Sequence, residues 1–293
     1  MKHIGLFAAG VLPPAASVLR HNLSTLSISL RRTSDLPPEA EQEVRASPST
    51  SSAMMNERSA AGGGTGGAGM TFQGYTQETV DFLWGIRFNN ERGWFMDHKQ
   101  DYQNHLLSPT RALAEQVYDA IHEGFPDEPF LLKMSRIYRD ARRLHGQGPY
   151  KDHLWFCIRT GDQDWTGRPT FYFEIAPDYY SYGMGFWCPR PALMAAYRQG
   201  IDRHPEELSR LVRQFNKQDV FALAGPEYAR SKGETTPLLR PWYNRKSINL
   251  QHDVPLDDRI FSPELAQDVI NGFRSLMPFY RYFDRLCAST AEA

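Results

Sequence analysis

The residues best suited to chemistry lie in one short basic segment. Between residues 133 and 153, six cationic side chains face only Asp140 and Asp152, which gives a formal charge of 6 − 2 = +4. The six are Lys133, Arg136, Arg139, Arg142, Arg143 and Lys151. A guanidinium presents a planar fork of donors that matches a phosphate or carboxylate, and a lysine adds a mobile point charge. This composition predicts an anion site.

The expected ligand contacts of this site are Arg136, Arg139, Arg142, Tyr150 and Lys151. Glycines 146 and 148 would let backbone N–H groups approach an anion closely. If a strand over 131–138 continues regularly, alternation places Arg136, Asp140 and Arg142 on one face and Arg139 on the other. The alternative is a structural network, in which Arg139 and Asp140 pair to tie a strand to a helix and the remaining cations are solvated.

Candidate acid and base groups lie next to this segment. Residues 154–158 and 170–175 alternate between apolar and polar types with period two, which predicts two half-buried strands joined by the polar loop 160–168. If Leu154 and Phe171 face the core, His153, Trp155, Tyr172 and Glu174 share the opposite face. We therefore take His153, Glu174 and Asp140 as catalytic candidates, because imidazole and carboxyl groups are the usual general acids and bases. The alternative is that the N-terminal helices cover this face as a second packed layer.

Other chemistries find little support in the sequence. The nine histidines form no H-E-x-x-H or H-x-H pattern, so we expect no metal site, and no cofactor motif stands in a credible context. The three cysteines lack C-x-x-C spacing, which favours a reducing, cytoplasmic location. A net charge of −1 makes nucleic acid an improbable partner, although Trp155, Tyr172 and Tyr182 would offer stacking surfaces. No apolar run is long enough for a membrane span.

The order of predicted elements is that of an α+β fold. Helical spacing marks the N-terminal third, with start signals at Thr76, at Asn89 or Asn90, and at Ser108-Pro109. Strands follow in the middle, with further candidates over 131–138 and 180–186. Helical spacing returns over 193–215 and in a last helix that opens at Ser262-Pro263 and that we expect Pro278 to interrupt. We predict a central, mostly antiparallel sheet flanked by N-terminal and C-terminal helices.

The chain divides into three predicted regions. Residues 1–69 form an extension rich in Pro, Ser and Gly, which composition predicts to be disordered or to precede the true translation start. Its acid-free first 34 residues loosely resemble an organellar transit peptide, and the apolar run Ile4 to Leu12 loosely resembles a secretory signal. Residues 70–288 form a single α+β domain, and residues 289–293 form a disordered tail.

Three spaced motifs resemble those of a bacterial family known as domain of unknown function 2461. They are R-x-x-R-D-x-R from Arg136 to Arg142 with Pro149-Tyr150-Lys151, F-N-N-E-R-x-W-F from Phe88 to Phe95, and Tyr182-Gly183-Met184-Gly185. The chain departs from the family pattern in two places. Arg143 stands where a Phe is usual, and Gly146-Gln147 stands where an acid–lysine pair is usual. The resemblance implies no reaction, substrate or cofactor.

Overall fold

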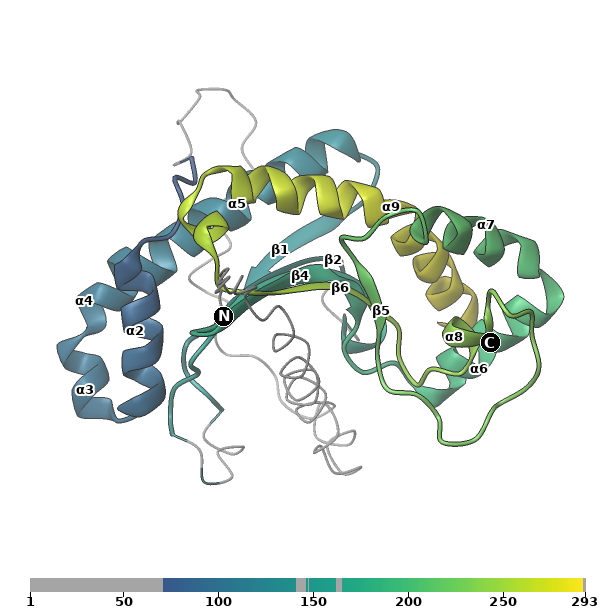
Figure 1. Ribbon diagram of the computed structural model, residues 1–293, viewed down its shortest axis with the longest axis horizontal. Helices are drawn as coiled ribbons and strands as arrows, with labels where there is room; N and C mark the ends of the chain where they lie inside the picture. Colours follow the sequence, from purple (N-terminus) through teal and green to yellow (C-terminus); the bar gives the residue numbers. More distant parts are fainter. Residues whose placement is uncertain (1–70, 141–145, 147, 162–164, 292–293) are drawn as a thin grey trace, which may run out of the picture. The chain divides into compact units, whose positions relative to one another are not determined.

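A computed structural model describes residues 71–140, 146, 148–161 and 165–291, all of which lie in one compact unit. The predicted N-terminal extension falls outside the described residues, and the predicted boundaries at residues 69 and 288 stay predictions. The centre of the unit is a six-stranded antiparallel sheet in the order β1-β2-β3-β4-β6-β5 (Figure 1). Its strands are β1 Phe130–Met134, β2 Leu154–Thr160, β3 Pro169–Ile175, β4 Tyr179–Phe186, β5 Ala222–Ala224 and β6 Asn249–Pro255.

Helices precede and follow this sheet in the chain, so the α+β prediction is confirmed. The N-terminal set is α2 Gln77–Phe88, α3 Arg92–Asp97, α4 Lys99–Asp101, the π-helical turn η3 Tyr102–Leu107 and α5 Ser108–Gly124. The later set is α6 Pro191–Arg203, α7 Pro205–Phe215, α8 Arg240–Tyr243 and α9 Glu264–Ala291, with short 3-10 turns at η5 Trp165–Gly167 and η6 Asp258–Phe261.

One face of the sheet carries the core. Helices α5 and α9 pack across this face (Figure 1), where Phe156, Phe171 and Phe173 are fully buried. The register pairs Trp155 with Glu174 and Cys157 with Tyr172, so these side chains share the other face, as alternation predicted. Among the N-terminal helices that the structure describes, α5 packs on the apolar face of the sheet. Helix α2 contacts the ends of the strands, where Arg87 pairs with Asp152 and Asp178.

The Ser108-Pro109 pair begins α5, as predicted, but it does not begin at a free helix end. The helical path already runs through α4 and η3, and Leu107 before α5 has helical backbone angles. Pro109 lacks the N–H that would bond the carbonyl of His105, and the backbone passes this point as a π-helical turn. The Thr79 hydroxyl of α2 donates to that His105 carbonyl at 2.5 Å, which links the first two long helices.

Two element predictions were wrong in their bounds. Pro278 does not end the last helix, because α9 continues to Ala291 with the proline inside it. Its apolar stripe stays buried on both sides of Pro278, from Leu265 to Phe283, and this packing outweighs the one backbone bond that the proline removes. The strand expected over 131–138 ends at Met134, so the alternation argument does not apply to the arginines beyond it.

Candidate functional site

The basic segment forms two arms that lie side by side after β1. The first arm runs from Ser135 to Asp140 and the second from Gly148 to His153. Backbone bonds join them, from Arg139 N to Pro149 O at 2.8 Å and from Lys151 N to Ile137 O at 2.7 Å. The connecting residues 141–145 and 147 lie outside the described residues, and Arg142 is among them.

Asn90 fixes the second arm to the N-terminal helices. Its Nδ2 donates to Tyr150 O and its Oδ1 accepts from Tyr150 N, both at 2.9 Å. A β-carbon on Gly148 would lie 2.2 Å from Asn90 Oδ1, so only glycine fits this approach. The Tyr150 ring is 3% exposed and stacks on Phe95 with ring centres 4.2 Å apart. Tyr150, which we predicted as a ligand contact, thus anchors the arm to the core.

The prediction that Asn89 or Asn90 caps the start of the second helix was wrong, although Asn89 does cap the end of α2. Asn89 terminates α2 and donates to Gly85 O at 3.0 Å, while Glu91 precedes α3. Asn90 is instead a long-range contact between the first two motifs. The joint presence of the two motifs was the signal in the sequence that could have indicated this contact. Local rules for helix ends predicted only that an asparagine here caps a helix.

Asp152 is the centre of an ion-pair network that the sequence analysis missed. Its side chain is 10% exposed and meets Arg87 Nε at 2.7 Å, His153 Nδ1 at 3.2 Å and Arg139 Nη2 at 3.6 Å. Burial alone would raise the pKa of this carboxyl, but hydrogen bonds and charges from His153 and Arg87 outweigh it and hold the pKa well below its usual range. Arg87 reaches onward to Asp178 at 3.2 Å.

Arg139 belongs to this network. Besides Asp152, its Nε donates to Tyr150 O at 2.7 Å. The predicted catalytic candidate His153 lies against Asp152 at the start of β2. Asp140 is exposed at the end of the first described arm. The structure therefore gives Arg139 and His153 contacts that hold the two arms against α2.

Lys151 and Arg136 form a second group outside that network. Lys151 Nζ donates to Arg136 O at 2.8 Å and lies 5.7 Å from the ring centre of Trp155. Burial lowers the pKa of the Lys151 ammonium, and the charges of Arg139 and Arg136 lower it further, while Glu174 opposes them. No described carboxylate lies within 4 Å of the Lys151 or Arg136 charge.

A row of polar side chains continues from Trp155 across the sheet. Each of Trp155, Glu174, Ser181 and Asp253 lies directly opposite the next, on β2, β3, β4 and β6. Ser181 Oγ donates to Asp253 Oδ1 at 2.5 Å, and Tyr179 donates to Glu174. Sequence reasoning missed Ser181 and Asp253. Alternation along β4 contained the signal for Ser181, but pairing β4 with β6 required the fold.

Tyr172 joins the same row through its hydroxyl, which lies 3.2 Å from Ser181 Oγ. Burial raises the pKa of Tyr172, so this hydroxyl stays protonated at neutral pH. Burial also raises the pKa of the neighbouring Cys157 thiol, in keeping with a packed and unreactive cysteine. Among the described residues, no three His, Cys, Asp or Glu side chains are grouped as a metal site would need. No described helix is long and apolar enough to span a membrane.

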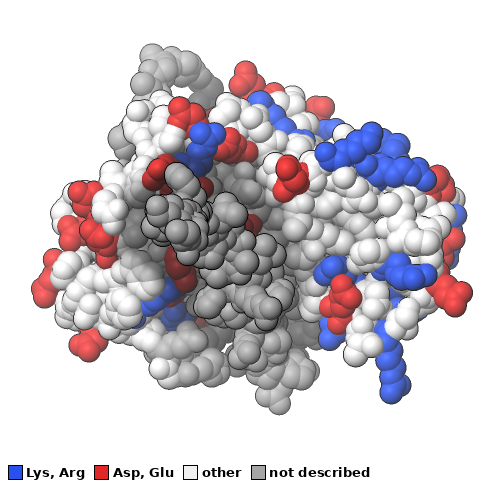
Figure 2. All heavy atoms as spheres, in the orientation of Figure 1, with Lys and Arg blue, Asp and Glu red and all other residues white. Residues whose placement is uncertain are grey.

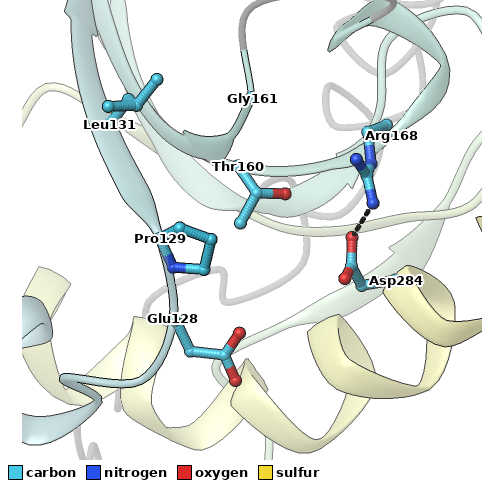
Figure 3. A pocket seen from close by; sticks show the side chains of 7 residues that line it. All are labelled: Glu128, Pro129, Leu131, Thr160, Gly161, Arg168 and Asp284. Atoms are coloured by element: carbon cyan, nitrogen blue, oxygen red, sulfur yellow. Dashed lines mark hydrogen bonds and ion pairs between the residues drawn. The ribbon is translucent and has the colours of Figure 1, made fainter. Parts of the chain in front are cut away.

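A hollow of about 450 Å³ lies elsewhere on the molecule, at the far end of β2 (Figure 3). Thr160, Arg168 and Asp284 point toward it, and Arg168 pairs with Asp284 at 2.9 Å across one side. None of the predicted site residues lines this hollow. The arms and the polar row therefore remain the candidate site.

Comparison with known protein families gives a match over most of the described residues. A family model described as "conserved hypothetical protein (DUF2461)" matches residues 78–282. The match begins in α2, covers both arms and the whole sheet, and ends in α9. No curated protein matches the chain.

Proposed function

The chain belongs to the DUF2461 family of conserved hypothetical proteins, as its motifs suggested, and from its site we propose that it binds a small anionic molecule bearing a phosphate or carboxylate. The family description names no reaction. The proposal therefore depends on the two arms and the polar row of the sheet.

The observation that carries the proposal is the crowding of like charges at Lys151. Its half-buried ammonium lies near two guanidinium groups, and its nearest described partner is a backbone carbonyl, not a carboxylate. Crowded cations in a partly desolvated place raise the free energy of the unliganded protein. An anion bound between Lys151 and Arg136 would remove that cost and would gain charge-assisted hydrogen bonds.

The neighbouring groups suit the rest of such a ligand. Trp155 offers an aromatic surface beside the ammonium, and Glu174 lies opposite it as a hydrogen-bond acceptor. Glu174 is also the group we would assign as acid or base if the ligand is a substrate, because it is the described carboxylate that acts on the Lys151 charge. Arg139 serves as a support in this proposal, since Asp152 and Tyr150 already engage it.

A second candidate function has its own observation. The Asp152 network joins Arg87, Arg139 and His153 across 65 residues of chain, which is what a purely fold-stabilising ion-pair cluster would do. In that case the domain would act as a structural or protein-interaction module. The two candidate functions can be distinguished at Lys151, because anion binding requires its ammonium and a structural module does not.

Isothermal titration calorimetry with inorganic phosphate and pyrophosphate tests the proposal. Each charge-assisted hydrogen bond contributes about 1.5–3 kcal/mol, so Lys151→Ala should weaken binding at least tenfold. Binding should also take up protons at a pH near the lowered pKa of Lys151, because the anion raises that pKa. Titrations in buffers with different ionisation enthalpies measure this uptake.

Lys217→Ala is the matched control, since Lys217 is an exposed lysine after α7. It should bind both anions as the wild type does. Absence of binding to either probe, or equal affinity in Lys151→Ala and the wild type, contradicts the anion site and favours the structural module.

A further inference from the structure

A separate basic groove lies between α7 and α9. Lys and Arg side chains gather over these two helices in the upper right of Figure 2. The groove encloses about 310 Å³, and four exposed arginines line it: Arg210 of α7, and Arg274, Arg281 and Arg285 of α9. It shares no residue with the anion site of the two arms, so the inference below does not depend on that proposal.

Two of the four arginines already hold a carboxylate. Arg281 Nε lies 2.8 Å from Glu128, and Arg285 pairs with Glu207. Arg274 donates to the Ala120 carbonyl at 3.2 Å, and within the described residues neither Arg274 nor Arg210 has a carboxylate within 4 Å. The groove therefore already pairs two arginines with carboxylates of the same chain. The guanidinium groups of Arg210 and Arg274 can still bind carboxylates of a partner.

The arginines of α9 lie on one stripe. Arg274, Arg281 and Arg285 are seven and four residues apart, so they recur on the same side of the helix over about 16 Å. Between them the wall is apolar. Pro278 is exposed there, and the half-buried Phe125 ring lies 5.3 Å from the Arg281 guanidinium.

We propose that this groove binds an acidic amphipathic helix of a partner protein. Carboxylates of such a helix would pair with Arg210 and Arg274, the two arginines that hold none of the described carboxylates, and apolar side chains on its adjacent stripe would contact Phe125 and Pro278. Charge complementarity identifies the partner as acidic. The apolar wall and the existing carboxylate pairs favour a protein segment over an extended polyanion, which would make no use of either.

Fluorescence anisotropy with a labelled synthetic peptide tests this proposal. The probe is an 18-residue helix-forming peptide with Glu at spacings of seven and four beside a stripe of Leu, and its control has Gln at the Glu positions. The Glu peptide should bind the full chain more tightly than the Gln peptide. Exposed ion pairs are individually weak, so Arg210→Ala should weaken binding only a few-fold, and Arg210→Glu with Arg274→Glu should weaken it about tenfold or more.

Arg213→Glu is the matched control, because Arg213 is exposed on α7 but does not line the groove. Circular dichroism melts confirm that each variant is folded, and Arg210→Ala changes only an exposed side chain. The proposal is overturned if the Glu and Gln peptides bind equally or if Arg210→Glu with Arg274→Glu binds the Glu peptide as the wild type does. Inorganic polyphosphate or single-stranded DNA that binds this groove more tightly than the Glu peptide overturns it as well.

Discussion

Replacing Asp152 by Ala should destabilise the protein far more than its single carboxylate suggests. The substitution removes the acceptor for Arg87, Arg139 and His153 together, at distances of 2.7, 3.6 and 3.2 Å. It leaves two guanidinium groups, each about a quarter exposed, without their carboxylate.

The burial of this network sets the expected magnitude. Removing one partner of a fully buried ion pair costs about 3–5 kcal/mol, whereas exposed pairs contribute about 0–1 kcal/mol. Asp152 is nearly buried and its arginine partners are partly exposed, so we expect a loss of about 2–4 kcal/mol in the free energy of unfolding. For a domain of this size that corresponds to a fall in Tm of roughly 5–15 °C.

Urea denaturation followed by circular dichroism measures this loss, with Asp178→Ala as the matched control. Asp178 binds the same Arg87 at 3.2 Å, but its side chain is 53% exposed, so its removal should cost less than about 1 kcal/mol. A double-mutant cycle with Arg139→Ala then isolates the Arg139–Asp152 interaction. If Asp152→Ala and Asp178→Ala cost the same, the network does not hold the arms and the reasoning is refuted.

The same carboxylate predicts a pH dependence. Its pKa is lower in the folded state than the value of about 3.9 expected in the unfolded chain. The unfolded state therefore binds the proton more readily, and the Asp152 contribution is present above about pH 4 and is lost as the pH falls below it. The stability difference between wild type and Asp152→Asn should therefore be present at pH 5 and shrink as the pH falls below about 4.

The remaining predictions concern two other contacts. Asn90→Ala removes both side-chain bonds to the Tyr150 backbone and should cost about 1–3 kcal/mol, with faster hydrogen exchange at the Tyr150 amide; unchanged exchange would show that Asn90 is not the clamp. Gly183→Ala would place a β-carbon 2.1 Å from the Leu250 carbonyl, so β4 and β6 must separate, and thermal melts should show a loss of about 2 kcal/mol or more. Gly200→Ala is its control: it meets no atom within 4 Å in α6 and should leave stability equal or higher by about 0.5–1 kcal/mol.

Local patterns predicted most of the secondary structure. The strands around Phe156, Phe173 and Tyr182 and the helix ending at Gly124 follow from apolar periodicity, which depends only on nearby residues. The errors arose where distant residues decided the outcome. At Pro278 core packing carries α9 past its predicted end, and at Asn90 a contact with the Tyr150 backbone replaces the predicted helix cap.

The candidate site shows the same division. Composition predicted that the candidate site lies in the basic segment. Alternation predicted that Trp155 and Glu174 share one face of the sheet. The addition of Ser181 and Asp253 to that face depended on strand pairing between β4 and β6, which no local pattern specifies.

Proximity in the chain is enough to concentrate arginines and lysines between residues 133 and 153. Which of them form ion pairs depends on long-range contacts. Asp152 became the centre of an ion-pair network because α2 brings Arg87 to it from 65 residues away. Arg139 pairs with the same Asp152, whereas Lys151 lies beside Arg136 and donates to a backbone carbonyl. This difference between Arg139 and Lys151 depends on long-range geometry and not on residue type.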